Sequence, residues 1–267
     1  MDTDERELSG VDADRPNAAR IYDYYLGGAH NFAVDRRVAE QAIVVYPDIP
    51  LMAHANRAFL RRVVLWLVAA GVRQFLDVGS GIPTVGHLHE IAQSVAPASR
   101  VVYVDIDAVA ISHTRHILAG DGRAAVVRAD FRRPDDILDA PEVHQLLDFT
   151  EPVAVLLLAL LHHLPDVEDP VPLISRLTAP LVPGSYLAIS HGTEDGRDGT
   201  TFVRDIYRRG GLGLRSRSRA EVEALFAGWE LVEPGVVWVP QWRPEWPDDP
   251  RRRPEDSLFY GGVARKS

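Results

Sequence analysis

The spacing of apolar residues along the chain changes from helical to strand-like near residue 72. Before that point, apolar positions recur every three or four residues, which is typical of amphipathic helices. After it, short and nearly continuous apolar runs alternate with amphipathic stretches. Apolar runs without polar alternation predict strands that are buried on both faces, as in a parallel sheet between two helical layers. The pattern therefore predicts an α/β protein with a helical N-terminal extension.

The N-terminal part is predicted to contain a short tail and three helices. The first helix begins near Pro16 and ends at Gly27 and Gly28, because proline favours a first helical turn and glycine a helix end. Charge and missing apolar periodicity predict that the tail is disordered. The predicted helices cover about 16–26, 35–45 and 51–70. The predicted divisions are a tail at 1–14, a helical extension or lid at 15–71 and a core at 72–267.

The core is predicted to be a doubly wound, Rossmann-like, mostly parallel sheet of about seven strands with helices on both faces. The predicted strands are 74–78, 100–105, 124–128, 152–158, 185–190, 229–239 and 257–264. The predicted helices between them are 85–95, 108–119, 141–148, 168–180 and 219–227. Ser218, with Glu221 three residues later, forms a capping-box pattern at the start of the last helix.

Composition narrows the class of protein. Hydrophobic residues make up 46% of the chain and the net charge is −9, so we expect a globular protein that repels nucleic-acid phosphates. The longest apolar run, 153–161, is about half a membrane span, and the N-terminus lacks the features of a secretory signal. We therefore expect a soluble, cytoplasmic protein that does not associate with a membrane. The absence of cysteine excludes disulfides, thiolate metal ligands and a cysteine nucleophile.

No metal-binding pattern is found. The pairs His87 and His89, and His113 and His116, have no nearby acids in a ligand arrangement, so they are predicted to be solvated. The expectation is a protein without a metal centre.

The loop after the first predicted strand reads Asp77-Val-Gly79-Ser80-Gly81-Ile-Pro83. Ligands bind at the carboxyl ends of strands in such sheets, and glycines let the backbone approach them closely. A dinucleotide fingerprint would need a third glycine where Thr84 stands. A carboxylate at Asp77 would repel a pyrophosphate but can hold a cationic amino group. The loop therefore favours S-adenosylmethionine over NAD, with an NAD-dependent oxidoreductase as an alternative.

The ends of the next strands carry further candidates for cofactor binding. Asp105 can accept hydrogen bonds from both ribose hydroxyls, and Ile106 can pack on the adenine. Asp130 can accept from the adenine amino group, and Phe131 adds an apolar wall. Ala159 follows the fourth strand. The simpler alternative is that the glycines only form turns and that the aspartates cap strand ends and loops.

Histidines and tyrosines supply the candidates for catalysis. His162 and His163 follow the fourth strand and His191 ends the fifth, where a neutral histidine can act as a general base. The alternative is that they only shape the loop, since one of two adjacent histidines usually points away. Tyr25 is a further candidate. No base is needed if the acceptor is already ionised.

The first predicted helix is unusually rich in polar aromatic residues. Tyr22, His30 and Asn31 either belong to a lid over the cofactor, with Gly27 and Gly28 as its hinge, or to an amphipathic helix whose tyrosines are half buried. The two interpretations are equally supported by the sequence.

Taken together, Asp77-x-Gly79-x-Gly81, Asp105, Asp130 and Leu161-His-His-Leu164 resemble a class I, Rossmann-like S-adenosylmethionine-dependent methyltransferase over roughly residues 72–192. A narrower resemblance, to the actinobacterial S-adenosyl methyltransferase family once described as a domain of unknown function, covers nearly the whole chain. It is carried by 15–28, Asn31-Phe32, Asp35-Arg36, 75–83, Trp242-Arg-Pro244 and Tyr260-Gly-Gly-Val263.

The resemblance implies an antiparallel last strand, S-adenosylmethionine as cofactor with S-adenosylhomocysteine as product, and an unidentified, small-molecule methyl acceptor. It implies neither the acceptor's identity nor the oligomeric state. A non-catalytic module that senses S-adenosylmethionine or S-adenosylhomocysteine is the main alternative, because a fold does not settle activity.

Overall fold

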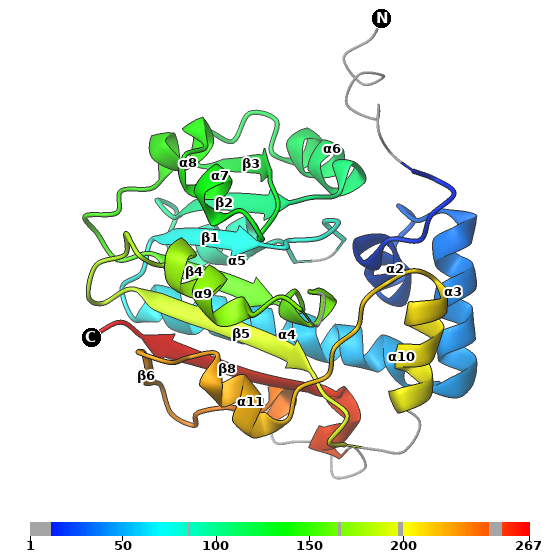
Figure 1. The fold of residues 1–267 in the computed structure, drawn as a ribbon. Helices are drawn as coiled ribbons and strands as arrows, with labels where there is room; N and C mark the ends of the chain where they lie inside the picture. Colours follow the sequence, from blue (N-terminus) through cyan, green and yellow to red (C-terminus); the bar gives the residue numbers. More distant parts are fainter. Residues whose placement is uncertain (1–11, 85, 165–166, 197–199, 246–252) are drawn as a thin grey trace, which may run out of the picture.

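The computed structural model describes residues 12–84, 86–164, 167–196, 200–245 and 253–267. Over these residues the chain forms an eight-stranded sheet in the order β3-β2-β1-β4-β5-β8-β6, with β7 paired to β8 (Figure 1). The strands are β1 (Gln74–Val78), β2 (Arg100–Asp105), β3 (Ala124–Arg128), β4 (Ala154–Leu158), β5 (Tyr186–Gly192), β6 (Glu230–Leu231), β7 (Val237–Trp238) and β8 (Phe259–Arg265). The predicted Rossmann-like fold is therefore confirmed.

The first five strands run parallel and β8 runs antiparallel to β5. All residues of β1 and β4 are buried, as expected for strands covered on both faces. Strands β2 and β3 are added on one side of β1, and after β3 the chain returns to add β4 and β5 on the other side. The topological switch point therefore lies between β1 and β4. Loops that follow these strands leave the same edge of the sheet, which is where a ligand is expected.

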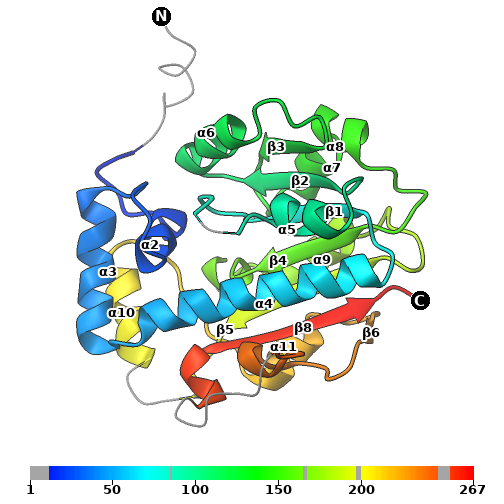
Figure 2. The same ribbon diagram turned by 180° about the vertical axis from the view of Figure 1, so that it is seen from behind.

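Helices cover both faces of the sheet (Figures 1 and 2). One apolar layer joins the sheet to α4 (Ile49–Ala69), α5 (Leu88–Val95) and α6 (Ala108–Ile117). The other joins it to α7 (Pro134–Leu138), α8 (Pro141–Leu146), α9 (Pro170–Leu177) and α11 (Arg219–Ala224). The two layers give the sheet a large apolar core. None of the described helices is long and apolar enough to cross a bilayer.

A third apolar cluster lies beyond the carboxyl ends of the strands (Figure 1). It is formed by α2 (Ala18–Tyr25), α3 (Ala33–Val45) and α10 (Thr200–Arg209). The predicted extension at 15–71 is thus divided by its packing. Helices α2 and α3 share this cluster with Ile49 and Ala53 at the start of α4, whereas Phe59, Val63 and Leu67 farther along α4 are completely buried against the sheet.

Several element boundaries differ from those predicted. The strand predicted at 229–239 is two short strands, β6 and β7, because Pro234 and Gly235 fall in a turn between them. Helices α7 and α10 were not predicted. The capping box of Ser218 and Glu221 is confirmed at the start of α11. The predicted disordered tail falls mainly on residues outside the described part of the chain.

Candidate functional site

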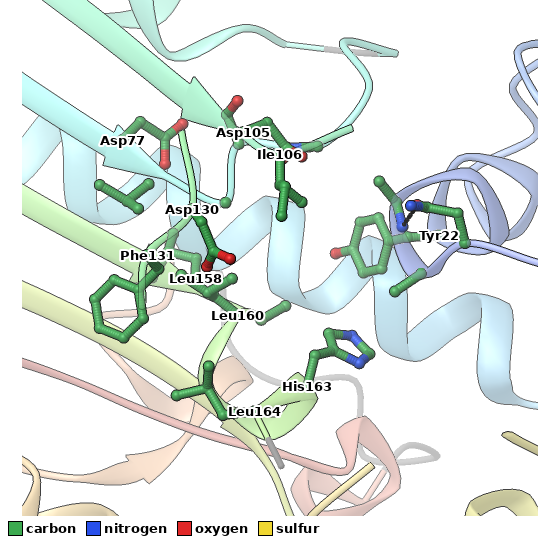
Figure 3. Close-up of a pocket in the computed structure, with 18 of the residues that line it drawn as sticks. Tyr22, Asp77, Asp105, Ile106, Asp130, Phe131, Leu158, Leu160, His163 and Leu164 are labelled. Carbon is green, nitrogen blue, oxygen red and sulfur yellow. Dashed lines mark hydrogen bonds between the residues drawn. The ribbon is translucent and has the colours of Figure 1, made fainter. Parts of the chain in front are cut away.

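A cavity of about 340 Å³ lies at the carboxyl ends of β1, β2 and β4, beneath α2. Figure 3 shows its labelled side chains coming from separate elements, with Ile106, Tyr22 and His163 around the same space and Asp105 above it. Most of the predicted site residues line it: Tyr22, Asp77, Gly79, Ser80, Gly81, Asp105, Ile106, Asp130, Phe131, Ala159 and His163. The residues predicted from the sequence are therefore brought together at one edge of the sheet.

The glycine loop brings bare backbone to this cavity. Gly79 and Gly81 have φ values of +74° and +68°, which side chains disfavour. A Cβ on Gly79 would come within 2.7 Å of Leu160, whereas one on Gly81 would meet nothing within 4 Å. Between them, the Ser80 hydroxyl is buried and has no hydrogen-bond partner among the described residues. The loop thus offers open space and an unused polar group to a ligand.

Asp105 is held rigidly at the end of β2. Its Oδ2 accepts from the Gly81 N–H at 2.7 Å, and its Oδ1 accepts from the Asp107 N–H at 2.9 Å. A carboxylate has about four acceptor positions, and the backbone N–H of Ile106 also acts on this one, so the group keeps part of its accepting capacity for a ligand. Burial raises the pKa of Asp105, although its backbone hydrogen bonds oppose this. The side chain lines the cavity and is prepared to accept hydroxyl donors.

Asp77 is a second buried carboxylate, 5% exposed, at the base of the cavity. Burial raises its pKa to about 7, against the opposing charge of Arg57. A cationic group in the cavity would favour the ionised form. Arg57 belongs to α4 and lines the same cavity, so a carboxylate ligand group would also find an opposite charge here.

The wall after β3 differs from the prediction in one respect. Phe131 is buried and lines the cavity as expected. Asp130 lines it too, but its carboxylate is already bound by Arg132, whose Nε donates to both carboxylate oxygens. Although burial opposes the effect, these hydrogen bonds hold the pKa of Asp130 below its ordinary value. An adenine amino group would therefore have to share Asp130 with Arg132.

A chain of hydrogen bonds links α2 to the end of the sheet. Tyr22 donates to the Ala53 carbonyl at 3.0 Å and accepts from Asn56 Nδ2 at 3.1 Å. The Oδ1 of Asn56 accepts from the Ser190 hydroxyl at 2.6 Å, and Ser190 Oγ accepts from the Ala159 N–H. Ala159 has a φ of +54°, which is strained for a residue with a side chain. These bonds fix Tyr22 over the cavity.

His30 and Asn31 are not brought to the cavity, contrary to their predicted role as cofactor contacts. Both are held by Asp23, whose Oδ2 accepts from the His30 N–H and from Asn31 Nδ2 at 2.9 and 2.8 Å. The ring of His30 packs on that of His113, with centroids 3.7 Å apart. A Cβ on Gly28 would lie 2.0 Å from Asp23 Oδ1, so Gly28 is required by packing.

The prediction that the other histidine pairs are solvated is wrong for His89. Its ring is buried, and its Nδ1 is 2.8 Å from the Tyr103 hydroxyl. Helix α5 packs against the sheet and carries His89 into this contact. Among the described residues, no group of three potential metal ligands is found.

The catalytic candidates differ sharply in their surroundings. His191 is fully buried, with Nδ1 2.8 Å from the Gly192 carbonyl and Nε2 2.6 Å from Arg217 Nη1. Since a carbonyl only accepts and a guanidinium only donates, both ring nitrogens of His191 are occupied. Burial lowers its pKa to about 3. His191 therefore has no nitrogen for a substrate proton.

His162 and Tyr25 are also hydrogen-bonded within the protein. The Nδ1 of His162 accepts from the Gly192 N–H at 3.2 Å, and burial lowers the pKa of His162 well below its ordinary value. The Tyr25 hydroxyl accepts from Tyr207 at 3.1 Å. Burial raises the pKa of Tyr25 far above its ordinary value. Neither residue lines the large cavity.

His163 is the one histidine of the pair that lines the large cavity. Its Nδ1 lies 3.2 Å from the Gly213 carbonyl and so carries the proton. Burial lowers the pKa of His163, which keeps the ring neutral near pH 7. Its Nε2 therefore carries the lone pair.

Several residues of the site were not predicted from the sequence. Asn56, Arg57 and Arg132 line the cavity, and Arg20 ties α2 to the core. A polar Asn56-Arg57 pair within the apolar helix α4 was the available signal for two of them. Arg132 and Arg20 lie in arginine-rich segments where nothing local distinguishes them.

Comparison with known proteins gives a consistent result. The profile of the family described as S-adenosyl methyltransferase matches residues 4–267. The chain is similar to a DUF574 family protein from Streptomyces avermitilis, with 44% identity, a TM-score of 0.92, and coverage of 96% of this chain and 99% of that one. It is also similar to a candidate methyltransferase from Thermobifida fusca, with 42% identity, a TM-score of 0.90, and coverage of 96% and 97%. Among curated proteins, none matches.

Proposed function

We propose, from the premise that this chain belongs to the S-adenosyl methyltransferase family, that the large cavity binds S-adenosylmethionine and that a small molecule receives the methyl group. Methyl transfer from S-adenosylmethionine is the activity of the family. The observation that carries the proposal is the Asp105 carboxylate, which backbone N–H groups hold in place at the cavity, beside a loop of bare backbone.

The chemistry of the donors and acceptors fits the cofactor. The adenosine sugar would bind Asp105, and the adenine would lie between Ile106 and Phe131. The ammonium group of the methionine end would bind Asp77, and its carboxylate would bind Arg57. Each charged group of the cofactor would then meet a side chain of opposite charge. The Ser80 hydroxyl, which is buried without a hydrogen-bond partner among the described residues, would be available to a polar atom of the cofactor.

The chain's own residues would act mainly by positioning the cofactor and the acceptor. When bound, the cofactor supplies a methyl group that its sulfonium already activates. The protein must then align an acceptor with this methyl group and exclude water. Alignment of two reactants can give an effective molarity of about 10⁵ M or more. Tyr22, fixed by Asn56, closes the cavity from the side of α2. A second cavity of about 70 Å³ adjoins it and offers space for an acceptor, which supports an enzyme over a sensor.

An actinobacterial source and a cytoplasmic location remain predictions.

Calorimetric titration tests the proposed site. We expect the chain to bind S-adenosylmethionine and S-adenosylhomocysteine and to show no saturable binding of NAD, because Asp77 would face a pyrophosphate and Thr84 replaces the third glycine of a dinucleotide loop. Equal affinity for S-adenosylmethionine and NAD, or no binding of either, would contradict the proposal.

Cofactor affinity should also depend on pH through Asp77. In the free protein its pKa is raised to about 7, and a bound ammonium would lower it. Below pH 7 the free carboxyl is protonated and binding must expel that proton. Affinity should therefore fall by up to about tenfold per pH unit between about pH 7 and pH 5.5. Titrations of Asp77→Asn should show weaker binding and a much flatter pH profile; an unchanged profile would exclude Asp77 as the titrating group.

A further inference from the structure

The second cavity adjoins the large one, and Ala18, Tyr22 and His163 line both. These three residues mark the junction at which an acceptor would reach the cofactor. Among the other walls of the second cavity are aromatic and aliphatic side chains: Tyr25, Met52, Tyr207, Leu258 and Phe259. Arg215 adds a guanidinium. This lining favours a flat, neutral molecule and disfavours a cationic amine.

The three histidines near this wall have different hydrogen-bonding capacities. Both nitrogens of His191 are occupied, and Nδ1 of His162 is taken by the Gly192 N–H. His163 alone of the three lines both cavities. The Gly213 carbonyl fixes its proton on Nδ1, and no described residue binds its Nε2. The lone pair that can take a proton at the junction therefore belongs to His163.

We propose that Nε2 of His163 is the general base that deprotonates the hydroxyl of a small aromatic acceptor, which enters from the second cavity. This inference rests on the proposed function, because it requires the cofactor in the large cavity. At about 70 Å³, the second cavity is smaller than the roughly 150 Å³ that holds a benzene ring. The ring would therefore lie across the junction, with its hydroxyl beside His163.

The step balances without a further reactant. The acceptor oxygen forms a bond to the methyl carbon, and the carbon–sulfur bond breaks with its electron pair going to sulfur. The O–H proton passes to Nε2, giving an imidazolium that later releases it to water. The Gly213 carbonyl accepts from Nδ1 throughout, which orients the ring and stabilises its positive charge, as the third member of other base-containing sites does.

A pair of phenols that differ in ionisation tests the proposal. At about pH 8, 4-methylphenol is neutral, whereas 4-nitrophenol is largely ionised because of its nitro group. We expect the unaltered chain to methylate both. His163→Gln should slow methylation of 4-methylphenol by about 10²-fold, a typical effect of losing a general base, and that of 4-nitrophenol by less than about threefold. Formation of S-adenosylhomocysteine measures both rates.

Two further measurements separate the possible failures. Nitrogen NMR of the His163 ring in the S-adenosylhomocysteine complex should show the proton on Nδ1, and calorimetry should show unchanged cofactor affinity in His163→Gln. His116→Gln, on the exposed part of α6, is the matched control. Equal loss with both phenols, a proton on Nε2, or no methylation of 4-methylphenol despite cofactor binding would overturn the proposal. Absence of cofactor binding would instead refute the proposed function.

Discussion

Replacing Asp105 by alanine should weaken binding of S-adenosylmethionine by about 10²- to 10⁴-fold. Two charge-assisted hydrogen bonds to the sugar would be lost, each worth about 1.5–3 kcal/mol. A loss of about 3–6 kcal/mol corresponds to this range, at about 1.4 kcal/mol per tenfold change. The loop would also loosen, because the Gly81 and Asp107 N–H groups lose their acceptor. Asp105→Asn, which keeps one acceptor oxygen, should give a smaller loss.

Calorimetric titration of both variants measures this effect, and thermal unfolding monitors the fold. Asp121→Ala is the matched control, since Asp121 binds Arg123 in the loop before β3 and does not line the cavity. The control should bind the cofactor as the unaltered chain does. An Asp105→Ala variant that stays folded and loses less than about tenfold in affinity would show that the sugar binds elsewhere.

The sequence predicted the part of the site that local patterns encode. Asp77 through Gly81 and Asp105 follow apolar runs, and the ends of parallel strands must meet at one edge of a sheet. The positions of β1 to β5 along the chain were predicted for a related reason, because buried strands such as β1 and β4 read as continuous apolar runs.

The rest of the site depends on contacts between distant segments. Nothing near Asn56 indicates that it meets Ser190, 134 positions away, or that this bond fixes Tyr22. The two histidines after β4 look equivalent in the sequence, and only the neighbouring Gly192 and Gly213 distinguish them. Helix α10 was missed because its apolar face packs on α3, outside the sheet that the pattern describes.

Replacing Asp35 by alanine should destabilise the protein by about 3–5 kcal/mol, because it removes the centre of a buried ionic network. Asp35 is completely buried and accepts from Arg20 Nε, the Asn17 N–H and the Phe32 N–H, each at 2.8 Å. The substitution would leave Asp107, whose Oδ2 is 3.6 Å away, as the carboxylate nearest the buried guanidinium of Arg20, which otherwise donates to the Asp12 and Arg15 carbonyls. Two backbone N–H groups would lose their acceptor as well.

The network joins α2 and α3 to the start of α6, so its loss should also be felt at the cavity. Urea unfolding measures the stability change, and hydrogen exchange should show earlier opening of α2 than of the strands. Glu40→Ala is the matched control: Glu40 lies on the same helix and is exposed, bound only to the Tyr24 hydroxyl among the bonds described. Its effect should stay below about 1 kcal/mol. If Asp35→Ala costs no more than this control, α2 is held over the cavity by apolar packing alone, and the ionic network is not what keeps Tyr22 in place.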